Sequence, residues 1–303
     1  MSAPSLKYRM LKKLIKAFGV KKFFQKDQEV IVERMRKEMY KVKIPRFSDT
    51  RVKYEVREFC GEKVIYITHK KPVKEVCLFL IGGGMLRHPT PDAIKGALKI
   101  ALASGRDMVI PYYPLCIDHT IDEVYDWLYR LYRSILESYD ISDMMITGSS
   151  SGGALALGLV SHINALGREV PLPKKIYCSS PGNCFRDRRS IEQGYELNRK
   201  DILLDMAYFE IYDKIMTHGR SVPEYMLFLE TGNYQGLEEV YLSYGSDEVL
   251  YAACDKIKNR LQEQGVNVIL EVGEGLFHCY PFFPIVKETQ DGWDKMVKYH
   301  SKR

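Results

Sequence analysis

The sequence lacks the marks of a membrane-spanning or disulfide-linked protein. Its longest apolar stretch, Val76 to Leu86, contains three glycines and is too short to span a bilayer. The seven cysteines are odd in number and form no C-x-x-C pair, and there is no N-x-S/T sequon. Lysines also interrupt the N-terminal region where a signal peptide needs an apolar segment. We therefore expect an intracellular, cytoplasmic protein with reduced thiols and no integral membrane association.

A strong positive field over the body of the chain is also absent. The net charge of +6 is uneven, because residues 1–45 hold 13 Lys and Arg against 4 Asp and Glu, while the remainder holds 32 against 35. The basic character thus belongs to the N-terminal segment, and the body is mildly acidic. This distribution argues against a nucleic-acid groove across the domain. Length and composition allow one large α/β domain or two smaller ones.

Two helical patterns occupy the basic N-terminal segment. Residues 5–18 place apolar side chains at Leu11, Leu14, Ile15 and Phe18 with lysines between them, which is helical spacing with a basic face. A second helix is expected over 27–40. We interpret residues 1–45 as a helical cap that packs on the body; the alternative is a surface that touches lipid or an amphiphilic substrate.

After residue 50 the pattern changes to short apolar runs that alternate with helices. A hairpin is expected from 52–56 and 64–67, joined at Gly61. Further strands are expected at 75–81, 107–113, 143–147, 174–179, 239–244 and 267–272. Helices are expected near 91–104, 121–138, 152–166, 248–264 and 286–299. This alternation predicts an α/β fold with a mostly parallel central sheet flanked by helices, over residues 46–303.

One stretch, 183–236, breaks this alternation. It contains no clear strand, and its residues 201–209 favour a helix. An insertion late in an α/β sheet is typical of a cap element above the strand ends. We therefore expect a second cap insertion here.

A glycine-rich turn follows the run at 143–147. Its sequence, Gly148 to Gly153, contains G-x-S-x-G with Ser150 at the centre. Small residues around a serine at a strand-to-helix turn permit the strained backbone of a nucleophile elbow. The alternative is a glycine-rich turn that cradles phosphate, but Ala154 stands where a Walker-type loop needs lysine.

A serine nucleophile needs a base and a group that orients the base. His278 lies in a loop just past the last expected strand, whereas His162 falls inside a helix and His300 in the C-terminal tail. The turn after the strand at 239–244 offers Asp247, where sites of open α/β sheets gather. Its neighbours Ser246 and Glu248 are alternative candidates for the cap of the next helix or for the acid. The order nucleophile, acid, base is that of an α/β-hydrolase.

A second glycine turn, Gly82-Gly83-Gly84, follows the run at 76–81. Alone it could be a flexible loop after a strand. Together with the elbow it indicates an oxyanion loop, in which the amides of Gly83 and Gly84 and the amide of Ser151 stabilise the developing negative charge.

These motifs resemble the hormone-sensitive-lipase-like (acetyl esterase/lipase) branch of the α/β-hydrolase superfamily. That branch carries H-G-G-G at the oxyanion loop and G-D-S-A-G-G at the elbow, with a D-Y-R-L-A-P-E-type segment between them. Residues 112–119 occupy the middle place, with Tyr113 and Leu115 matching. Three departures stand out: Ile81 replaces the histidine that braces the oxyanion loop, and Ser149 and Ser151 replace the acidic residue and the alanine beside the nucleophile. They affect rate and substrate preference more than reaction type.

Two later motifs extend the resemblance. Residues 245–250 are similar to the family's G-x-x-D-x-L, which selects Asp247 as the acid, and residues 278–280 resemble its final H-x-F, with Tyr280 as the aromatic residue. The resemblance covers residues 50–303, and the family's N-terminal cap accounts for 1–45.

The resemblance implies a serine carboxylesterase that hydrolyses small or medium acyl esters through an acyl-enzyme, with Ser150, Asp247 and His278 as the triad. It needs no metal or cofactor. It also implies a possible homodimer through the last edge strand, near 267–272. A lipase-like or other serine hydrolase with a different acyl preference stays open, as does a non-catalytic ligand-binding protein on the same fold.

Overall fold

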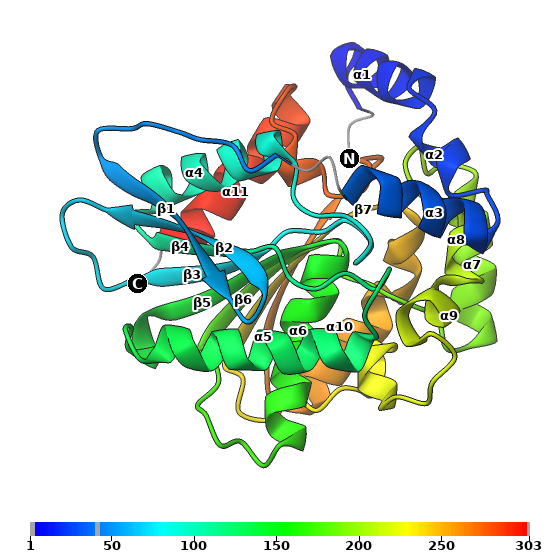
Figure 1. Cartoon of the computed structure of the whole chain (residues 1–303). Coiled ribbons are helices and arrows are strands. Elements are labelled where there is room, and N and C mark those ends of the chain that lie inside the picture. Colours follow the sequence, from blue (N-terminus) through cyan, green and yellow to red (C-terminus); the bar gives the residue numbers. More distant parts are fainter. Residues whose placement is uncertain (1–3, 40–42, 302–303) are drawn as a thin grey trace.

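The alternating segments form one eight-stranded sheet in the computed structural model, which describes residues 4–39 and 43–301 (Figure 1). The strand order is β1-β2-β4-β3-β5-β6-β7-β8; β2 runs antiparallel to β1 and β4, and the other neighbours are parallel. The strands are β1 (Val52–Phe59), β2 (Glu62–His69), β3 (Val76–Leu80), β4 (Asp107–Pro111), β5 (Met144–Ser149), β6 (Lys175–Ser179), β7 (Glu239–Gly245) and β8 (Asn267–Gly273). The expected hairpin and mostly parallel sheet are confirmed.

Helices cover both faces of the sheet. α4 and α11 pack on one face, and α5, α6 and α10 pack on the other (Figure 1). The helices are α1 (Leu6–Ala17), α2 (Val20–Phe23), α3 (Gln28–Met39), α4 (Pro91–Ser104), α5 (Ile121–Leu136), α6 (Ser151–Ala165), α7 (Arg188–Asn198), α8 (Met206–Phe209), α9 (Tyr212–Thr217), α10 (Cys254–Glu263) and α11 (Lys287–Ser301). The helix expected at 248–264 is divided into a 3₁₀ segment (Val249–Ala253) and α10.

Successive residues of a buried strand serve two separate cores. Leu78 belongs to the cluster under α5 and α6, while Cys77 and Phe79 belong to the cluster under α4 and α11. This division follows from the two-residue period of a strand, which sends neighbouring side chains to opposite faces. It explains why the parallel strands are apolar throughout.

Local signals set the helix boundaries. The Thr120 amide donates to Glu123 at 2.9 Å, which completes a capping box at the start of α5. At α4 the Thr90 hydroxyl accepts from the Ala93 amide, and the helix ends at Gly105 with φ 71°. Glycine adopts this left-handed conformation without the steric cost of a Cβ.

Two segments gather where the parallel strands end. α1, α2 and α3 come from the N-terminal segment and α7, α8 and α9 from 183–236, and both groups contact the loops after β3, β4 and β7 (Figure 1). For example, Tyr208 of α8 donates to the Gly84 carbonyl at 3.3 Å. The predicted helix over 27–40 is α3, and Tyr40 lies outside the described residues.

The expectation of a helix over residues 201–209 is wrong for the first half of that segment. Only Met206–Phe209 is helical, because the Asp201 carboxylate accepts the amides of Leu203 and Leu204 at 2.8 and 3.0 Å. An aspartate that bonds to nearby amides competes with helix formation. The structure also contains α7, which the sequence analysis did not predict.

Among the described residues, no helix combines the length and the apolar character that crossing a bilayer requires.

Candidate active site

Ser150 stands at a strained turn between β5 and α6. Its φ of 53° and ψ of −128° lie outside the regions that side chains with a Cβ normally adopt, and its amide donates to the Ser179 carbonyl at 2.8 Å. Strain of this kind at a strand-to-helix turn is the geometry of a nucleophile elbow. The predicted elbow thus has the expected backbone.

The glycines around Ser150 are required by close packing. A Cβ on Gly148 would lie 2.3 Å from the Gly152 carbonyl oxygen, and one on Gly152 would lie 2.0 Å from the Leu80 carbonyl oxygen. Real Cβ atoms do not approach so closely. The G-x-S-x-G spacing therefore reflects backbone contact between the elbow and the end of β3.

Two serines of the elbow hold the oxyanion loop. The Ser149 hydroxyl accepts from the Gly82 amide at 3.0 Å. The buried Ser151 hydroxyl accepts from the amides of Gly83 and Met85, both at 3.2 Å. These are two of the positions at which the sequence departs from the family pattern, and both side chains now have a structural explanation.

The third departure, Ile81, lies in the core instead of bracing the loop. Its side chain is buried in the apolar cluster beneath α4. The loop is tied from other directions: Tyr113 donates to the Ile81 carbonyl at 2.8 Å, and the Cys116 amide donates to the Met85 carbonyl at 2.7 Å. The matched Tyr113 therefore fixes the loop from the segment after β4.

The three amides expected to bind the oxyanion, those of Gly83, Gly84 and Ser151, differ in whether they already donate a hydrogen bond. The Gly83 amide already donates to Ser151 Oγ. Within the described residues no hydrogen bond occupies the amide of Gly84, which stands at φ 64° with Tyr208 Oη against its Cα. Ser151 is the first residue of α6, so its amide has no partner inside the helix. Gly84 and Ser151 thus offer the available donors.

The acid beside His278 is Glu248, and the expectation of Asp247 is wrong at this contact. His278 Nδ1 bonds to Glu248 Oε2, whereas the Asp247 carboxylate bonds to Lys12 of α1 at 2.5 Å. The adjacent side chains of Asp247 and Glu248 thus point to opposite sides of the turn that follows β7. Glu248 is fully buried, and the Asp247 side chain keeps 17% of its exposure.

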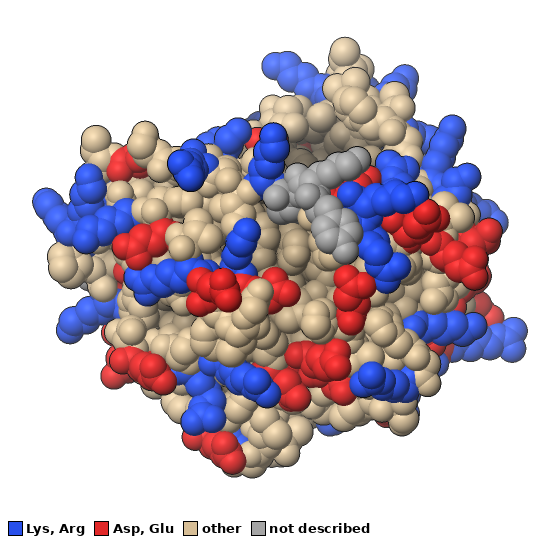
Figure 2. Space-filling view, in the orientation of Figure 1, with Lys and Arg blue, Asp and Glu red and all other residues tan. Residues whose placement is uncertain are grey.

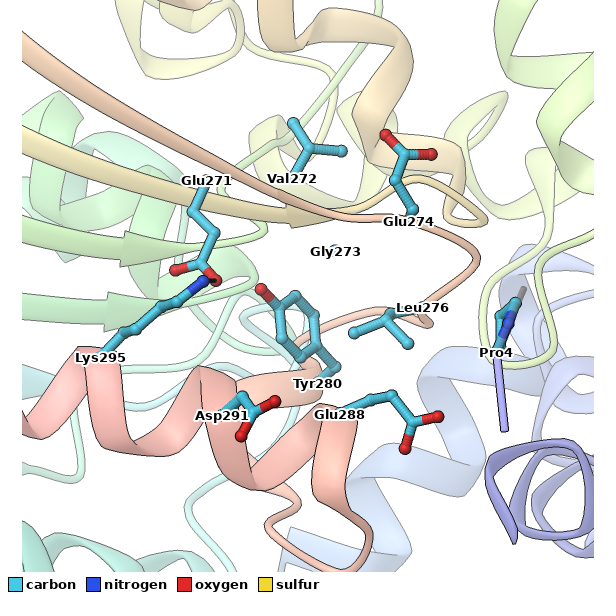
Figure 3. Close-up of a pocket in the computed structure, with 10 residues that line it drawn as sticks. All are labelled: Pro4, Glu271, Val272, Gly273, Glu274, Leu276, Tyr280, Glu288, Asp291 and Lys295. Atoms are coloured by element: carbon cyan, nitrogen blue, oxygen red, sulfur yellow. Dashed lines mark hydrogen bonds and ion pairs between the residues drawn. The ribbon is translucent and has the colours of Figure 1, made fainter. Parts of the chain in front are cut away.

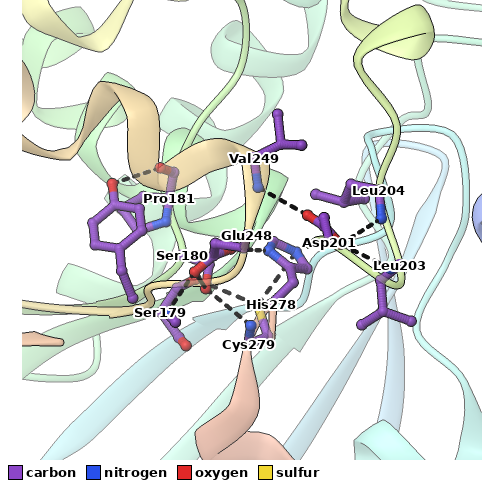
Figure 4. A network of polar contacts seen from close by, with 12 residues as sticks. Ser179, Ser180, Pro181, Asp201, Leu203, Leu204, Glu248, Val249, His278 and Cys279 are labelled. Atoms are coloured by element: carbon purple, nitrogen blue, oxygen red, sulfur yellow. Dashed lines mark hydrogen bonds and ion pairs between the residues drawn. The ribbon is translucent and has the colours of Figure 1, made fainter. Parts of the chain in front are cut away.

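The Glu248 carboxylate is fully engaged by hydrogen bonds (Figure 4). Its Oε1 accepts from the Ser180 hydroxyl and the Gly245 amide, each at 2.7 Å, and its Oε2 contacts His278. The Ser180 hydroxyl in turn accepts from the Cys279 amide at 2.9 Å. A buried carboxylate needs such partners to stay charged, and the network fixes the acid and the histidine loop together.

The environment sets the charge of His278. Burial by itself lowers the pKa of its imidazole, but interactions with Cys279 and with the Glu248 carboxylate outweigh burial and raise the pKa well above the ordinary value. A carboxylate on Nδ1 stabilises the imidazolium that forms when Nε2 accepts a proton. His278 is thus a stronger base than a free histidine.

The Ser150 elbow and the loop that carries His278 are both tied to Ser179 at the end of β6. The Ser179 carbonyl accepts from the Ser150 amide at 2.8 Å and from Cys279 Sγ at 3.5 Å. His278 Nε2 faces Cys279 Sγ at 3.5 Å, and among the described residues no hydrogen bond joins it to Ser150. Catalytic hydrogen bonds often form only when substrate is bound.

The other histidines have structural surroundings. His300 is buried, and its Nε2 lies 2.6 Å from the Thr147 hydroxyl. His162, on α6, contacts the Tyr225 hydroxyl and the Asp126 carboxylate. Burial lowers the pKa of His88 to about 4. These three histidines contact other parts of the fold, whereas the loop of His278 is tied to Ser179, which also binds the elbow.

Two surface hollows border the site without being lined by Ser150. One, of about 240 Å³, lies between β8 and α11, where the Lys295–Glu271 ion pair and Asp291 surround Tyr280 (Figure 3). The other, of about 480 Å³, lies between α1 and the turn that carries Asp247 and Gly275. The second hollow is lined both by α1 and by the turns that precede Glu248 and His278.

Comparison with known proteins supports the fold. A family model described as an alpha/beta hydrolase fold matches residues 77–282, and no curated protein matches the sequence. Solved structures with similar folds include an esterase from the bacterial hormone-sensitive lipase family (TM-score 0.79, 19% identity, 99% of each chain) and an esterase/lipase from an uncultured bacterium (0.78, 21%, 98% of each chain). A putative esterase from Staphylococcus aureus has a TM-score of 0.80 at 19% identity, over 92% of this chain and 94% of that chain.

The family match spans more than half of the chain and includes β3, the elbow, Glu248 and His278. The strand order, the elbow conformation and this match agree, and the protein belongs to the α/β-hydrolase family.

Proposed function

We propose that this protein is a serine carboxylesterase that hydrolyses small or medium acyl esters through an acyl-enzyme. The observation that carries the proposal is the pairing of a strained Ser150 elbow with a buried His278–Glu248 pair, both anchored on the end of β6. Glu248 takes the role that the sequence motif assigned to Asp247. The similar solved structures are of proteins described as esterases, which favours the same reaction class.

In the acylation step, Ser150 Oγ attacks the carbonyl carbon of the ester. His278 Nε2 takes the hydroxyl proton after turning from Cys279 Sγ toward Ser150, and Glu248 stabilises the resulting imidazolium. The C–O bond to the alcohol then breaks, the alcohol leaves with the proton from His278, and the acyl group stays on Ser150.

In the deacylation step, water attacks the acyl carbon and gives its proton to His278. The ester bond to Ser150 breaks, Ser150 recovers the proton, and the carboxylic acid leaves. No metal or cofactor takes part in either step.

Backbone amides stabilise the negative oxygen in both steps. The amides of Gly84 and Ser151 are the free donors, and Gly83 can join them only if it leaves Ser151 Oγ. A donor placed in advance at the developing charge lowers the barrier without reorganisation. The serines that hold this loop thus take over the bracing that the family assigns to the histidine replaced by Ile81.

We further propose that residues 1–45 and 183–236 act as the cap above the catalytic domain, 46–303. Both segments contact the loops that follow the sheet strands. The cap then decides acyl-chain length. β8 is an edge strand of the sheet, which fits a homodimer through this edge, and a cytoplasmic location remains our expectation.

Labelling with a fluorophosphonate probe tests the proposal, because such probes react only with activated serines. We expect labelling of Ser150 in the folded wild-type protein and none in His278→Ala. Turnover of p-nitrophenyl esters of increasing chain length then gives the acyl preference. Absence of labelling in folded wild-type protein contradicts the proposal.

Two contacts favour a second candidate, a non-catalytic ligand-binding protein. His278 Nε2 faces Cys279 Sγ, and Gly83 donates to Ser151, so neither group is set for ester hydrolysis. This candidate predicts binding of esters or acids without labelling and without turnover.

A further inference from the structure

α1 carries an apolar stripe that faces away from the protein. Leu6, Met10, Leu14 and Phe18 keep 65%, 63%, 57% and 75% of their exposure. They are spaced four residues apart and therefore follow one side of the helix. An exposed row of large apolar side chains marks a binding surface more often than chance, because water contact with such a row is unfavourable.

The opposite side of α1 attaches the helix to the body. Tyr8 is buried, donates to the Gly275 carbonyl at 3.0 Å and stacks on Phe277 at 5.9 Å. Lys12 bonds to Asp247 at 2.5 Å. Because these contacts use the inner side of the helix, the outer stripe contributes nothing to holding α1 in place.

Positive charge surrounds the stripe. α1 contains no acidic residue, and its basic side chains are Lys7, Arg9, Lys12, Lys13 and Lys16. Of these, only Lys12 has an ion-pair partner among the described residues. In Figure 2 the projecting top of the molecule, where Figure 1 places α1, shows uncharged surface bordered by Lys and Arg.

We propose that α1 docks this protein on an anionic lipid surface. The apolar stripe enters the boundary of the acyl chains, and the lysines beside it approach the lipid phosphates. A second copy of this chain is a poorer occupant, because a symmetric contact through the stripe would bring two identical basic patches together. An anionic membrane neutralises the same charges.

Docking through α1 has a consequence for the proposed active site. Tyr8 and Lys12 bind the two turns that precede His278 and Glu248, so the surface that touches lipid lies one helix thickness from the catalytic loops. The docking itself does not rest on the proposed function. A negative lipid-binding result would therefore leave the proposed catalytic function standing, and a negative catalytic result would leave the proposed docking standing.

Co-sedimentation with vesicles tests the proposal. We expect wild-type protein and the Ser150→Ala variant to bind phosphatidylcholine vesicles that contain about one third phosphatidylglycerol, and to bind pure phosphatidylcholine at least about tenfold more weakly. Raising the salt concentration from about 0.05 M to about 0.5 M should weaken the binding to the mixed vesicles, because salt screens the lysines.

Two variants separate the contributions. The double variant Met10→Ser, Phe18→Ser removes apolar contact, and Lys13→Glu, Lys16→Glu reverses charge; each should lower vesicle partitioning at least about tenfold. Leu166→Ser, which removes an exposed apolar side chain at the far end of α6, is the matched control and should bind like wild type. All three variants should keep the wild-type midpoint of thermal unfolding, because the replaced side chains are exposed.

Equal binding to both kinds of vesicle, or wild-type binding by both α1 variants, would overturn the proposal. So would concentration-dependent dimerisation in solution that the Met10→Ser, Phe18→Ser variant abolishes without any vesicle binding by wild-type protein. That result would assign the stripe to a second copy of the chain.

Discussion

Replacing Ser151 with alanine removes the hydroxyl that holds the oxyanion loop. Its Oγ accepts the amides of Gly83 and Met85, and Met85 is fully buried. Two lost hydrogen bonds at about 1 kcal/mol each lower the free energy of unfolding by about 2 kcal/mol. For a chain of 303 residues the midpoint of thermal unfolding should fall by about 3 °C.

The kinetic effect should appear in kcat. The loop positions Gly84, whose amide we propose as a donor to the oxyanion, so a looser loop should weaken transition-state binding more than substrate binding. Loss of one complete oxyanion donor costs about 100-fold or more; a displaced donor should cost about tenfold. We expect KM for a short p-nitrophenyl ester to stay within about twofold of the wild-type value.

Two variants make this result interpretable. Ser149→Ala removes a single hydrogen bond, to Gly82, and should lose about half as much stability. Ser161→Ala deletes a buried hydroxyl further along α6 and should leave kcat unchanged. If Ser151→Ala retains wild-type kcat and thermal midpoint, the Ser151 hydroxyl does not hold the loop and the reasoning is refuted.

Further predictions concern the acid, the pH profile and the elbow. Glu248→Gln should lower kcat/KM by about 10³-fold or more, whereas Asp247→Asn should change it by less than about tenfold; the reverse order, measured with p-nitrophenyl esters, would restore Asp247 as the acid. Because the pKa of His278 is raised and the base must be neutral, kcat/KM should fall as the pH drops through a midpoint above the ordinary value of about 6.5. Glu248→Gln should move that midpoint to lower pH, and a pH-rate profile with an unmoved midpoint would separate Glu248 from the titration. Gly152→Ala should prevent stable folding, because its Cβ would lie 2.0 Å from the Leu80 oxygen; a soluble variant with the wild-type thermal midpoint would contradict that packing.

The elbow and the sheet could be predicted because their signals are local. The G-x-S-x-G motif around Ser150 is contained in five consecutive residues, and the alternation of strands and helices indicates the layers of the sheet. Both follow from the chain itself, without knowledge of distant partners. The same holds for the capping box at Thr120.

The acid could not be fixed by such local signals. Asp247 and Glu248 are adjacent carboxylates, and the choice between them depends on Ser180, Lys12 and His278, which come from distant parts of the chain. The motif comparison selected Asp247, which does not contact His278, because spacing alone does not tell which side chain turns inward.

The occupied amide of Gly83 could not be predicted either. Nothing in the sequence indicates that Ser151 turns its hydroxyl toward the oxyanion loop instead of solvent, since that depends on the approach of two loops. The missing first half of the helix at 201–209 also escaped prediction, because the sequence does not show that the Asp201 carboxylate accepts the amides of Leu203 and Leu204.

The central claim is that Ser150 is the nucleophile of an ester hydrolase. Steady-state hydrolysis of p-nitrophenyl butyrate by wild-type protein and by Ser150→Ala tests it most directly. We expect readily measurable turnover by the wild-type protein and a drop of about 10⁶-fold in kcat for the variant, with the thermal midpoint retained. Near-normal hydrolysis by a folded Ser150→Ala protein would contradict the account.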